Sequence, residues 1–349
     1  MVLAYVVSNG PDTISVIDTK THSLIASTLV GGDPNDVAIS PDGKLAYVTN
    51  TSFQSNTMSV IDTKTHSVIA TVAVGAATFA VEFTPDGKLA YVTDNIDSII
   101  AIDSKTHSVI ATIFLEDNAD VIEFTPDGKL AYVTDGSSIS PDDVVYVIDT
   151  KTHSLIATVG VGENPNNIAI TPDGKLAYVT NEQSNNVSVI DTKTHSIIAT
   201  VLAGIRPQDV KFTPDGKLSY VVNQGDDLTS GSVTVIDVKT HSVIATIPIA
   251  NPGDSPSNIA ISPDGKLAYV DTFNGNTVTA LDMKTHSIIA TVAQLENNLR
   301  FVEFTPDGKF VYVGNEGENT VNVIDTKIHS VIATVSVGSN PVAIAFTPH

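Results

Sequence analysis

The chain has 349 residues, 42% of them hydrophobic, and a formal net charge of −21 at pH 7. This charge argues against nucleic acid as a partner, because neutralisation of phosphates dominates such binding. The absence of cysteine excludes disulfide and thiol chemistry, and no apolar run approaches the roughly 18 residues of a membrane span.

A repeat of about 44 residues runs through the whole chain. The tetrapeptide Pro-Asp-Gly-Lys occurs seven times, beginning at Pro41, Pro85, Pro126, Pro172, Pro214, Pro263 and Pro306. A second signature, Asp-x-Lys-x-His-Ser, occurs eight times, with its histidine at His22, His66, His107, His153, His195, His241, His286 and His329. The length alone suggests two or three domains, but the uninterrupted repeat predicts one domain spanning residues 1–349.

In chain order, the first apolar run, at residues 3–7, matches the second run of later repeats and has no first run before it. Each complete repeat then holds four runs rich in Val, Ile, Tyr, Phe and Thr, as at 80–84, 88–93, 99–103 and 108–113. Such runs between turn residues are typical of strands, and no window has a sustained helical period. Four antiparallel strands in a repeat of this length predict one blade of a β-propeller.

The two signatures predict two kinds of turn. Pro-Asp-Gly-Lys joins the first and second runs as a tight hairpin, because Pro presets its backbone angle and Gly supplies a left-handed residue. Asp-x-Lys-x-His-Ser joins the third and fourth runs. Its histidines come one per repeat, too far apart to share a metal ion. We therefore expect each His to hydrogen-bond within its own hairpin.

The chain ends on residues 341–348, which match a first run with nothing after it. The two terminal fragments together make one blade, closed by pairing of the C-terminal strand beside the N-terminal one. We therefore predict an all-β, eight-bladed propeller of four-stranded antiparallel blades, whose closure removes exposed sheet edges. Because residues 1–10 already belong to a strand, we expect no signal peptide in this chain, although one could have been removed.

Tyr47-Val-Thr-Asn50 and Tyr178-Val-Thr-Asn181, with Ile-Asp-Thr and Ile-Ala-Thr-Val in the same repeats, resemble the YVTN-type β-propeller repeat. The resemblance covers the whole chain and implies the propeller fold. It also implies an extracellular or cell-surface location, because this repeat is familiar from surface-layer and other cell-surface proteins. It implies no catalytic residues, because the shared motif is a packing motif. Copies such as Tyr269-Val-Asp-Thr272 and Tyr312-Val-Gly-Asn315 depart from it at the loop end of the strand.

The connections of the blades fall on two faces. We call the face with the two repeated turns the bottom face and the opposite face the top face. The bottom turns hold 15 of the 16 lysines and 15 of the 39 acidic residues, which leaves the excess negative charge on the blade bodies and the top face. The top loops differ in every blade, as at 50–57, 135–143 and 223–231. Because loops on a rigid scaffold usually carry function, we expect the top face to be the interaction surface.

The first strand of each blade should line a central channel. Its middle position is Ala in four blades and charged in the other four, at Glu82, Glu123, Lys211 and Glu303. Charges in strands that should be largely buried are costly unless they are paired, hydrated or bound to a metal. They are either solvated by a water-filled channel, or they bind a cation or a polar ligand, with Glu82, Glu123 and Glu303 as ligands of a divalent cation such as Ca²⁺. The residues expected to form the wall of the top mouth are Phe79, Asp120, Arg206, Asp209, Arg300 and Phe301.

Three hypotheses of function follow, and the fold alone does not choose among them. The first is a monomeric, noncatalytic binding or surface-scaffold protein that takes cations, a small polar ligand or a protein at its top face. The second is a metal-assisted hydrolase, lactonase or lyase with its site in the channel, where Lys211 or Arg206 would orient the substrate. The third is an amplified or engineered repeat protein with no small-molecule site. No motif of a nucleophilic, zinc or phosphate-binding enzyme occurs in the sequence.

Overall fold

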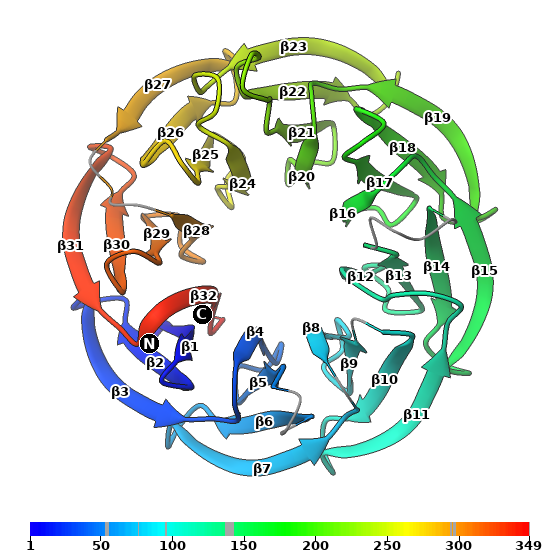
Figure 1. Ribbon diagram of the computed structural model, residues 1–349, viewed down its shortest axis with the longest axis vertical. Coiled ribbons are helices and arrows are strands. Elements are labelled where there is room, and N and C mark those ends of the chain that lie inside the picture. The colour runs from blue at the N-terminus through cyan, green and yellow to red at the C-terminus, as the bar shows by residue number, and fades with distance from the viewer. Residues whose placement is uncertain are drawn as a thin grey trace.

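The computed structural model describes residues 1–348 except 53–55, 76, 95, 137–142, 294 and 296–297. In these residues, 32 strands form eight four-stranded antiparallel sheets, arranged as blades around a central axis (Figure 1). This confirms the predicted eight-bladed propeller. The described residues include no helix that could span a membrane.

Each blade runs outward from an innermost first strand to a fourth strand at the rim (Figure 1). The innermost strands are β4 (Pro34–Ile39), β8 (Thr78–Phe83), β12 (Ile122–Phe124), β16 (Pro165–Ile170), β20 (Pro207–Phe212), β24 (Pro256–Ile261), β28 (Leu299–Phe304) and β32 (Ser339–Phe346). The second strands are β1 (Leu3–Gly10), β5 (Leu45–Asn50), β9 (Leu89–Asp94), β13 (Leu130–Thr134), β17 (Leu176–Asn181), β21 (Leu218–Asn223), β25 (Leu267–Thr272) and β29 (Phe310–Asn315).

The outer half of each blade is built in the same way. The third strands are β2 (Thr13–Asp18), β6 (Thr57–Asp62), β10 (Ser98–Asp103), β14 (Val144–Asp149), β18 (Asn186–Asp191), β22 (Ser232–Asp237), β26 (Thr277–Asp282) and β30 (Thr320–Asp325). The rim strands are β3 (Ser23–Leu29), β7 (Ser67–Ala73), β11 (Ser108–Phe114), β15 (Ser154–Gly160), β19 (Ser196–Leu202), β23 (Ser242–Pro248), β27 (Ser287–Val292) and β31 (Ser330–Ser336).

The ring closes where the two ends of the chain meet. β32 pairs with β1 in the sheet β3-β2-β1-β32, with Val6 opposite Ile344, and the two termini lie side by side in Figure 1. The backbone N–H of Thr347 donates to the carbonyl of Leu3 at 2.9 Å, and Leu3 N–H donates to Thr347 Oγ1 at 2.9 Å. The predicted closure of one blade from both ends of the chain is confirmed.

The Pro-Asp-Gly-Lys turns are held by short local contacts, as at 84–88. Gly87 has a φ of +69° and donates its N–H to the carbonyl of Thr84 at 2.7 Å. The Thr84 hydroxyl donates to Asp86 at 2.9 Å, and Lys88 Nζ pairs with Asp86 at 2.6 Å. A side chain at this glycine would need a left-handed backbone, which other residues adopt reluctantly. The turn is therefore specified almost entirely by its own residues.

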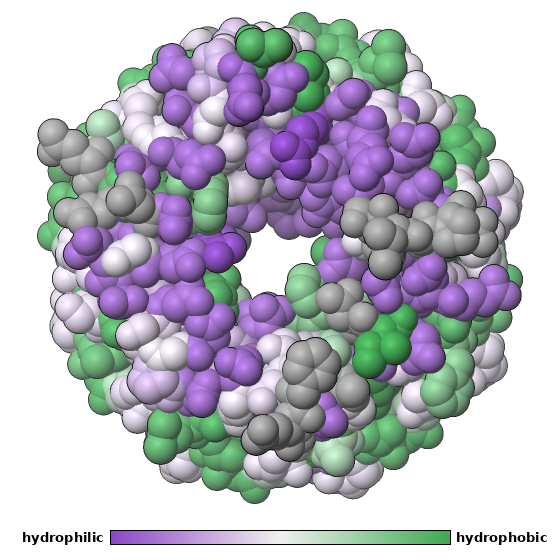
Figure 2. Space-filling view, in the orientation of Figure 1, coloured by the Kyte–Doolittle hydropathy of each residue, from purple (hydrophilic) through white to green (hydrophobic). Residues whose placement is uncertain are grey.

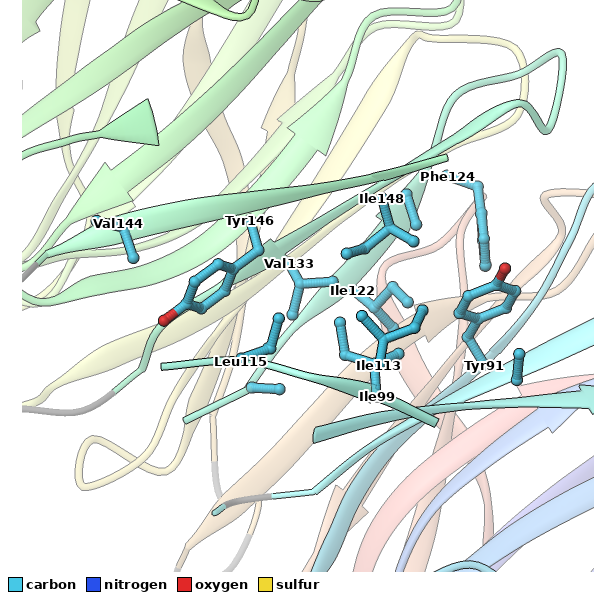
Figure 3. Packing of buried hydrophobic residues seen from close by; sticks show 13 residues of the cluster. Tyr91, Ile99, Ile113, Leu115, Ile122, Phe124, Val133, Val144, Tyr146 and Ile148 are labelled. Carbon is cyan, nitrogen blue, oxygen red and sulfur yellow. The ribbon is translucent and has the colours of Figure 1, made fainter. Parts of the chain in front are cut away.

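The core lies in the seams between neighbouring blades, because both faces of each sheet are covered. In the seam shown in Figure 3, Ile99, Ile113 and Leu115 of one blade pack against Ile122 and Val133 of the next. Each seam also buries the repeated tyrosine of the second strand completely. Because burial of apolar surface stabilises a fold by roughly 25 cal/mol per Å², the seams stabilise the ring.

The histidines of the bottom turns form hydrogen bonds within their own hairpins, as expected, and also across the seams. Within the hairpin, the backbone N–H of His66 donates to the carbonyl of Asp62 at 2.8 Å. Each His does adopt the left-handed backbone of a turn residue, for example His66 with a φ of +56°. Its Nδ1, however, forms a hydrogen bond of 2.6–3.0 Å with a tyrosine hydroxyl of the preceding blade. The pairs are Tyr5–His66, Tyr47–His107, Tyr91–His153, Tyr132–His195, Tyr178–His241, Tyr220–His286, Tyr269–His329 and Tyr312–His22.

Candidate functional site: the central channel and its top mouth

The channel is open along the axis of the ring, and hydrophilic residues gather around the mouth that faces the viewer (Figure 2). The Glu82, Lys211 and Glu303 side chains are exposed and Glu123 is half-buried. The first strands therefore bury these charges less than expected, which agrees with the alternative that the water of the channel solvates them. Short side chains at the same position, such as Ala38, stay buried in the seam, whereas the long charged side chains reach the water of the channel.

Lys211 is the cation around which the channel charges are arranged. Its Nζ lies 3.7 Å from Oδ1 of Asp209, and its side chain is 47% exposed whereas Asp209 is buried. Asp209 is fixed in turn, because its Oδ2 accepts the backbone N–H of Ile259 in the next blade at 3.0 Å. The pKa of Lys211 is raised by Asp209 first, and by Glu123 and Glu303, against the opposing effect of burial. The ammonium group is therefore charged throughout the neutral range.

The three channel glutamates have pKa values displaced towards neutrality. Desolvation by the surrounding blades, followed by the charges of Glu123 and Asp36, raises the pKa of Glu82 to about 8. Desolvation likewise raises the pKa of Glu123 and of Glu303 to about 7, while Lys211 opposes both shifts. Because Glu82 and Glu303 still contact channel water, part of this desolvation is screened. Groups poised between their two protonation states at neutral pH are typical of functional sites.

The structure does not gather the three glutamates into a metal centre. Within the described ranges, no group of three or more His, Cys, Asp or Glu side chains could hold a metal ion. The charge of Lys211 lowers the pKa of Glu82, Glu123 and Glu303 to different extents, and an ammonium group that acts on all three disfavours a second cation. The arrangement does not fit one divalent ion bound by all three carboxylates.

The two arginines expected at the mouth are held by ion pairs on the top face. Arg206 donates from Nε and Nη2 to Oε1 of Glu182, at 2.8 and 2.6 Å. Arg300 pairs through Nε with Glu316 at 2.5 Å, and its guanidinium carbon lies 5.2 Å from the centre of the Phe273 ring. Both arginines are thus held in short ion pairs, whereas Nζ of Lys211 lies 3.7 Å from Asp209, so Lys211 is the cation better placed to meet a ligand.

The remaining mouth candidates support the wall in different ways. Phe79 is half-buried, and its carbonyl accepts hydrogen bonds from side chains of the preceding blade. Burial, together with the charge of Asp135, raises the pKa of the half-buried Asp120 to about 6. Phe301 is buried in the seam, where its ring lies so close to Gly314 that a side chain there would collide with it. Phe301 therefore supports the wall of the channel by packing in the seam, and its side chain is not exposed at the mouth.

The structure adds a buried carboxylate that sequence reasoning did not select. Asp271 is fully buried next to Asp209 and accepts hydrogen bonds from the Ser257 hydroxyl, the Asn258 N–H and the Asn258 amide at 2.8–2.9 Å. Burial raises its pKa to about 6 despite these donors. At the position equivalent to Asp271 in another blade, the hydroxyl of Thr180 accepts the backbone N–H of Asn167 at 3.0 Å. The sequence feature that could have identified Asp271 is its place in Tyr269-Val-Asp271, where other repeats have Tyr-Val-Thr.

Concavities also lie on the bottom face, opposite the face on which function was expected. They recur at the seams between the repeated turns, with volumes of about 630, 560, 440 and 430 Å³. Met283 and Val238 line the two larger ones, where the smaller ones have Ser104 and Thr192. The Ser104 and Thr192 hydroxyls each donate to a glycine carbonyl of the adjoining turn at 2.6 Å. Met283 and Val238 have no hydroxyl group to form this hydrogen bond, and the concavities that they line are the larger ones.

Comparison with known proteins agrees with the propeller architecture. A family described as YNCE-like beta-propeller matches residues 137–229, and one described as lactonase, 7-bladed beta-propeller, matches residues 196–346. No curated protein sequence shows a significant match. Each family match covers less than half of the chain.

Solved structures resemble the whole ring. A structure described as hydrazine synthase from Kuenenia stuttgartiensis is 26% identical, with a TM-score of 0.66 over 85% of this chain and 97% of that one. Dihydro-heme d1 dehydrogenase NirN in complex with DHE is 17% identical, with a TM-score of 0.81 over 98% and 74%. A functionally unknown protein from Desulfotomaculum acetoxidans is 17% identical, with a TM-score of 0.65 over 99% and 98%. Together with the family matches, these likenesses support a β-propeller protein.

Proposed function

We propose that this protein binds a small dipolar ligand in its central channel, which the ligand enters through the top mouth. The observation that carries the proposal is the Lys211 ammonium group, which is exposed to the channel, lies 3.7 Å from Oδ1 of Asp209, and is within electrostatic reach of Glu82, Glu123 and Glu303. A ligand carboxylate would meet Lys211, and a ligand ammonium or hydroxyl group would meet the glutamates.

The distribution of the charges favours a dipolar ligand over a simple ion. A lone cation would be repelled by Lys211, and a lone anion would be repelled by the surrounding carboxylates. A molecule with both charges satisfies both groups, and the low-dielectric wall of the ring strengthens each contact. Because the two arginines are held by Glu182 and Glu316, we assign them to the rigidity of the mouth.

Calorimetric titration with three matched probes tests the proposal: 4-aminobutyrate, butyrate and butylamine. We expect 4-aminobutyrate to bind more tightly than either singly charged compound, and both Lys211→Met and Glu303→Gln to weaken that binding. Lys217→Met on the bottom face is the matched control, because Lys217 is exposed and pairs with Asp215 outside the channel. Equal affinity for the three probes, or binding that survives Lys211→Met, would refute the proposal.

A second candidate is a lactonase-type hydrolase, favoured by the family match over residues 196–346, which contain Lys211, Asp271 and Glu303. Glu303, with a pKa of about 7, would take a proton from the water that attacks a lactone carbonyl. Lys211 would stabilise the oxyanion. The ring C–O bond would then break, and its oxygen would take up a proton to give a hydroxy acid. Proton release from γ-butyrolactone at constant pH tests this candidate, with Glu303→Gln as the inactive variant.

We also propose that the repeat is of the YVTN type and that the protein lies at the cell surface. Support for the repeat type comes from the repeated motif, in which Tyr47, Thr49 and Asn50 are buried and Asn50 bonds to Ser59 at 3.1 Å. The surface location is what the resemblance to YVTN-type repeats implies. Antibody labelling of intact and permeabilised source cells tests the location. Labelling that requires permeabilisation would place the protein inside the cell and remove the surface-scaffold role.

A further inference from the structure

The rim strands carry exposed apolar side chains in every blade, and one of these side chains departs from the repeat. The third residue of each rim strand is Ile, and all eight isoleucines are exposed. Figure 2 shows such hydrophobic residues along the rim. Phe114, the last residue of β11, is 73% exposed and is the only aromatic among the large exposed hydrophobic residues of the described chain. A single exposed apolar residue needs no explanation by itself, so the features that adjoin Phe114 decide whether it marks a binding site.

The backbone fixes Phe114 in this exposed position. Its neighbours Ile113 and Leu115 are buried in the seam with the following blade, where Figure 3 shows them among the core side chains. Successive side chains of a strand point to opposite sides. Phe114 therefore points towards the preceding blade and cannot turn inward unless Ile113 and Leu115 leave the core. An apolar group held in this way loses little conformational freedom on binding.

A cavity of about 340 Å³ lies beside the Phe114 side chain, at the outer end of the seam between the blade of β7 and the blade of β11. Val74 and Gly75 line it from one blade, and Ile96, Val109, Thr112 and Phe114 line it from the other. The apolar part of its lining and its opening at the rim suit a single apolar side chain brought in from outside.

The adjoining edge of β11 is free for strand pairing. The sheet order is β11-β10-β9-β8, so β11 is bonded to β10 on one side only, and no other described strand pairs with its outer edge (Figure 1). An exposed edge presents unpaired N–H and C=O groups that an extended peptide can join as a further strand. Backbone bonds to β11 and a side chain in the cavity would then act together.

The charges around the top end of this edge, next to Phe114, are acidic. Asp94 and Asp97 line the cavity, none of its lining residues is basic, and Glu116 is exposed just beyond the end of β11. Asp97 is tied to this end, because its carbonyl accepts the N–H of Leu115 at 2.7 Å. The protein as a whole carries a net charge of −21. An occupant of this edge should therefore be basic.

We propose that the free edge of β11 and the cavity beside Phe114 bind an extended basic peptide segment of another protein, which adds a strand and places one apolar side chain in the cavity. A second copy of this chain is a poorer occupant, because none of its eight rim strands contains Lys or Arg. This site lies outside the channel and does not depend on the function proposed above.

The test is fluorescence anisotropy with a short labelled peptide in which Lys alternates with Val around one central Phe. We expect Phe114→Ser to weaken binding roughly tenfold, which corresponds to about 1.4 kcal/mol, and Phe114→Leu to retain most of it. Asp97→Asn combined with Glu116→Gln should weaken binding and reduce its salt dependence. The same peptide with Glu in place of Lys should not bind.

Leu202→Ser is the matched control, because Leu202 ends β19 at the equivalent position and is 76% exposed. It should leave the affinity unchanged. If it weakens binding as much as Phe114→Ser does, or if Phe114→Ser has no effect, the proposed site is wrong. If sedimentation shows that the protein self-associates and that Phe114→Ser abolishes the association, the occupant is a second copy and the proposal is also overturned. Unchanged thermal melting of each variant establishes that it is folded.

Discussion

The hydroxyl oxygen of Tyr312 lies 3.0 Å from Nδ1 of His22, although 290 residues separate the two in the chain. Tyr312 belongs to the last complete blade, and His22 to the blade assembled from both termini. The same Tyr–His pair fastens the other seven seams. The blade built from the two termini is therefore closed by the backbone pairing of β32 with β1, and the side-chain bond between Tyr312 and His22 joins this blade to the preceding one.

Tyr312→Phe should lower the free energy of unfolding by about 1 kcal/mol, because the variant leaves the half-buried His22 ring without its partner. Tyr178→Phe, which breaks the equivalent bond to His241 in the middle of the chain, should cost a similar amount. Urea denaturation followed by circular dichroism measures both. No loss of stability in either variant would mean that these bonds contribute nothing net to the ring.

His22 should make the protein less stable in acid. Burial lowers the pKa of His22 below its ordinary value of 6.5, and Asp18 opposes the shift. The folded state therefore prefers neutral His22. Its contribution to stability is complete above about pH 6.5 and is lost as the pH falls through the folded pKa. The stability difference between the parent and His22→Gln, measured by urea denaturation, should be larger at about pH 7.5 than at about pH 5.5. A pH-independent difference would contradict this assignment.

The turns and the propeller fold could be predicted because their causes are local. The glycine, the Lys–Asp pair and the threonine hydroxyl of residues 84–88 act within one hairpin, and the same signature repeats seven times. The partner of each histidine could not be derived in this way, because it depends on the stagger between neighbouring blades. Tyr also recurs once per blade, so a signal was present, but no local spacing joins Tyr312 to His22.

The candidate site was predicted in part for the same reason. Glu82 and Lys211 were found because they interrupt a row of alanines, but their exposure depends on the width of the channel, which no single repeat specifies. Asp271 was noticed only as a departure from Tyr-Val-Thr, because its burial and its bond to Ser257 arise from residues brought together by folding. Phe114 gave no periodic signal, since the last residue of the rim strands varies from blade to blade.

Glu82→Gln should stabilise the protein at alkaline pH. Desolvation first, and then Glu123 and Asp36, raise the folded pKa of Glu82 to about 8 from 4.5. The contribution of Glu82 is therefore fully present below about pH 4.5 and is lost as the pH rises through about 8. A neutral amide avoids that loss. Thermal melting at about pH 9 should show a higher melting temperature for the variant than for the parent, with little difference near pH 4.5. Lower stability of the variant at about pH 9 would mean that ionised Glu82 is well paired.

Salt should stabilise the ring, and Ca²⁺ should add nothing beyond its ionic strength. With a net charge of −21, repulsion among carboxylates opposes the folded state, and salt screens it over roughly 8–10 Å at ordinary ionic strength. A specific Ca²⁺ effect would require several oxygen ligands at one point, and the described residues form no such group. The measurement is thermal melting in EDTA, in NaCl and in CaCl₂ at matched ionic strength, for the parent and for the triple variant Glu82→Ala, Glu123→Ala and Glu303→Ala. A Ca²⁺ effect shared by parent and triple variant would place the ion in the loops. A Ca²⁺ effect that disappears only in the triple variant would establish a metal in the channel, and with it the case for metal-assisted hydrolysis.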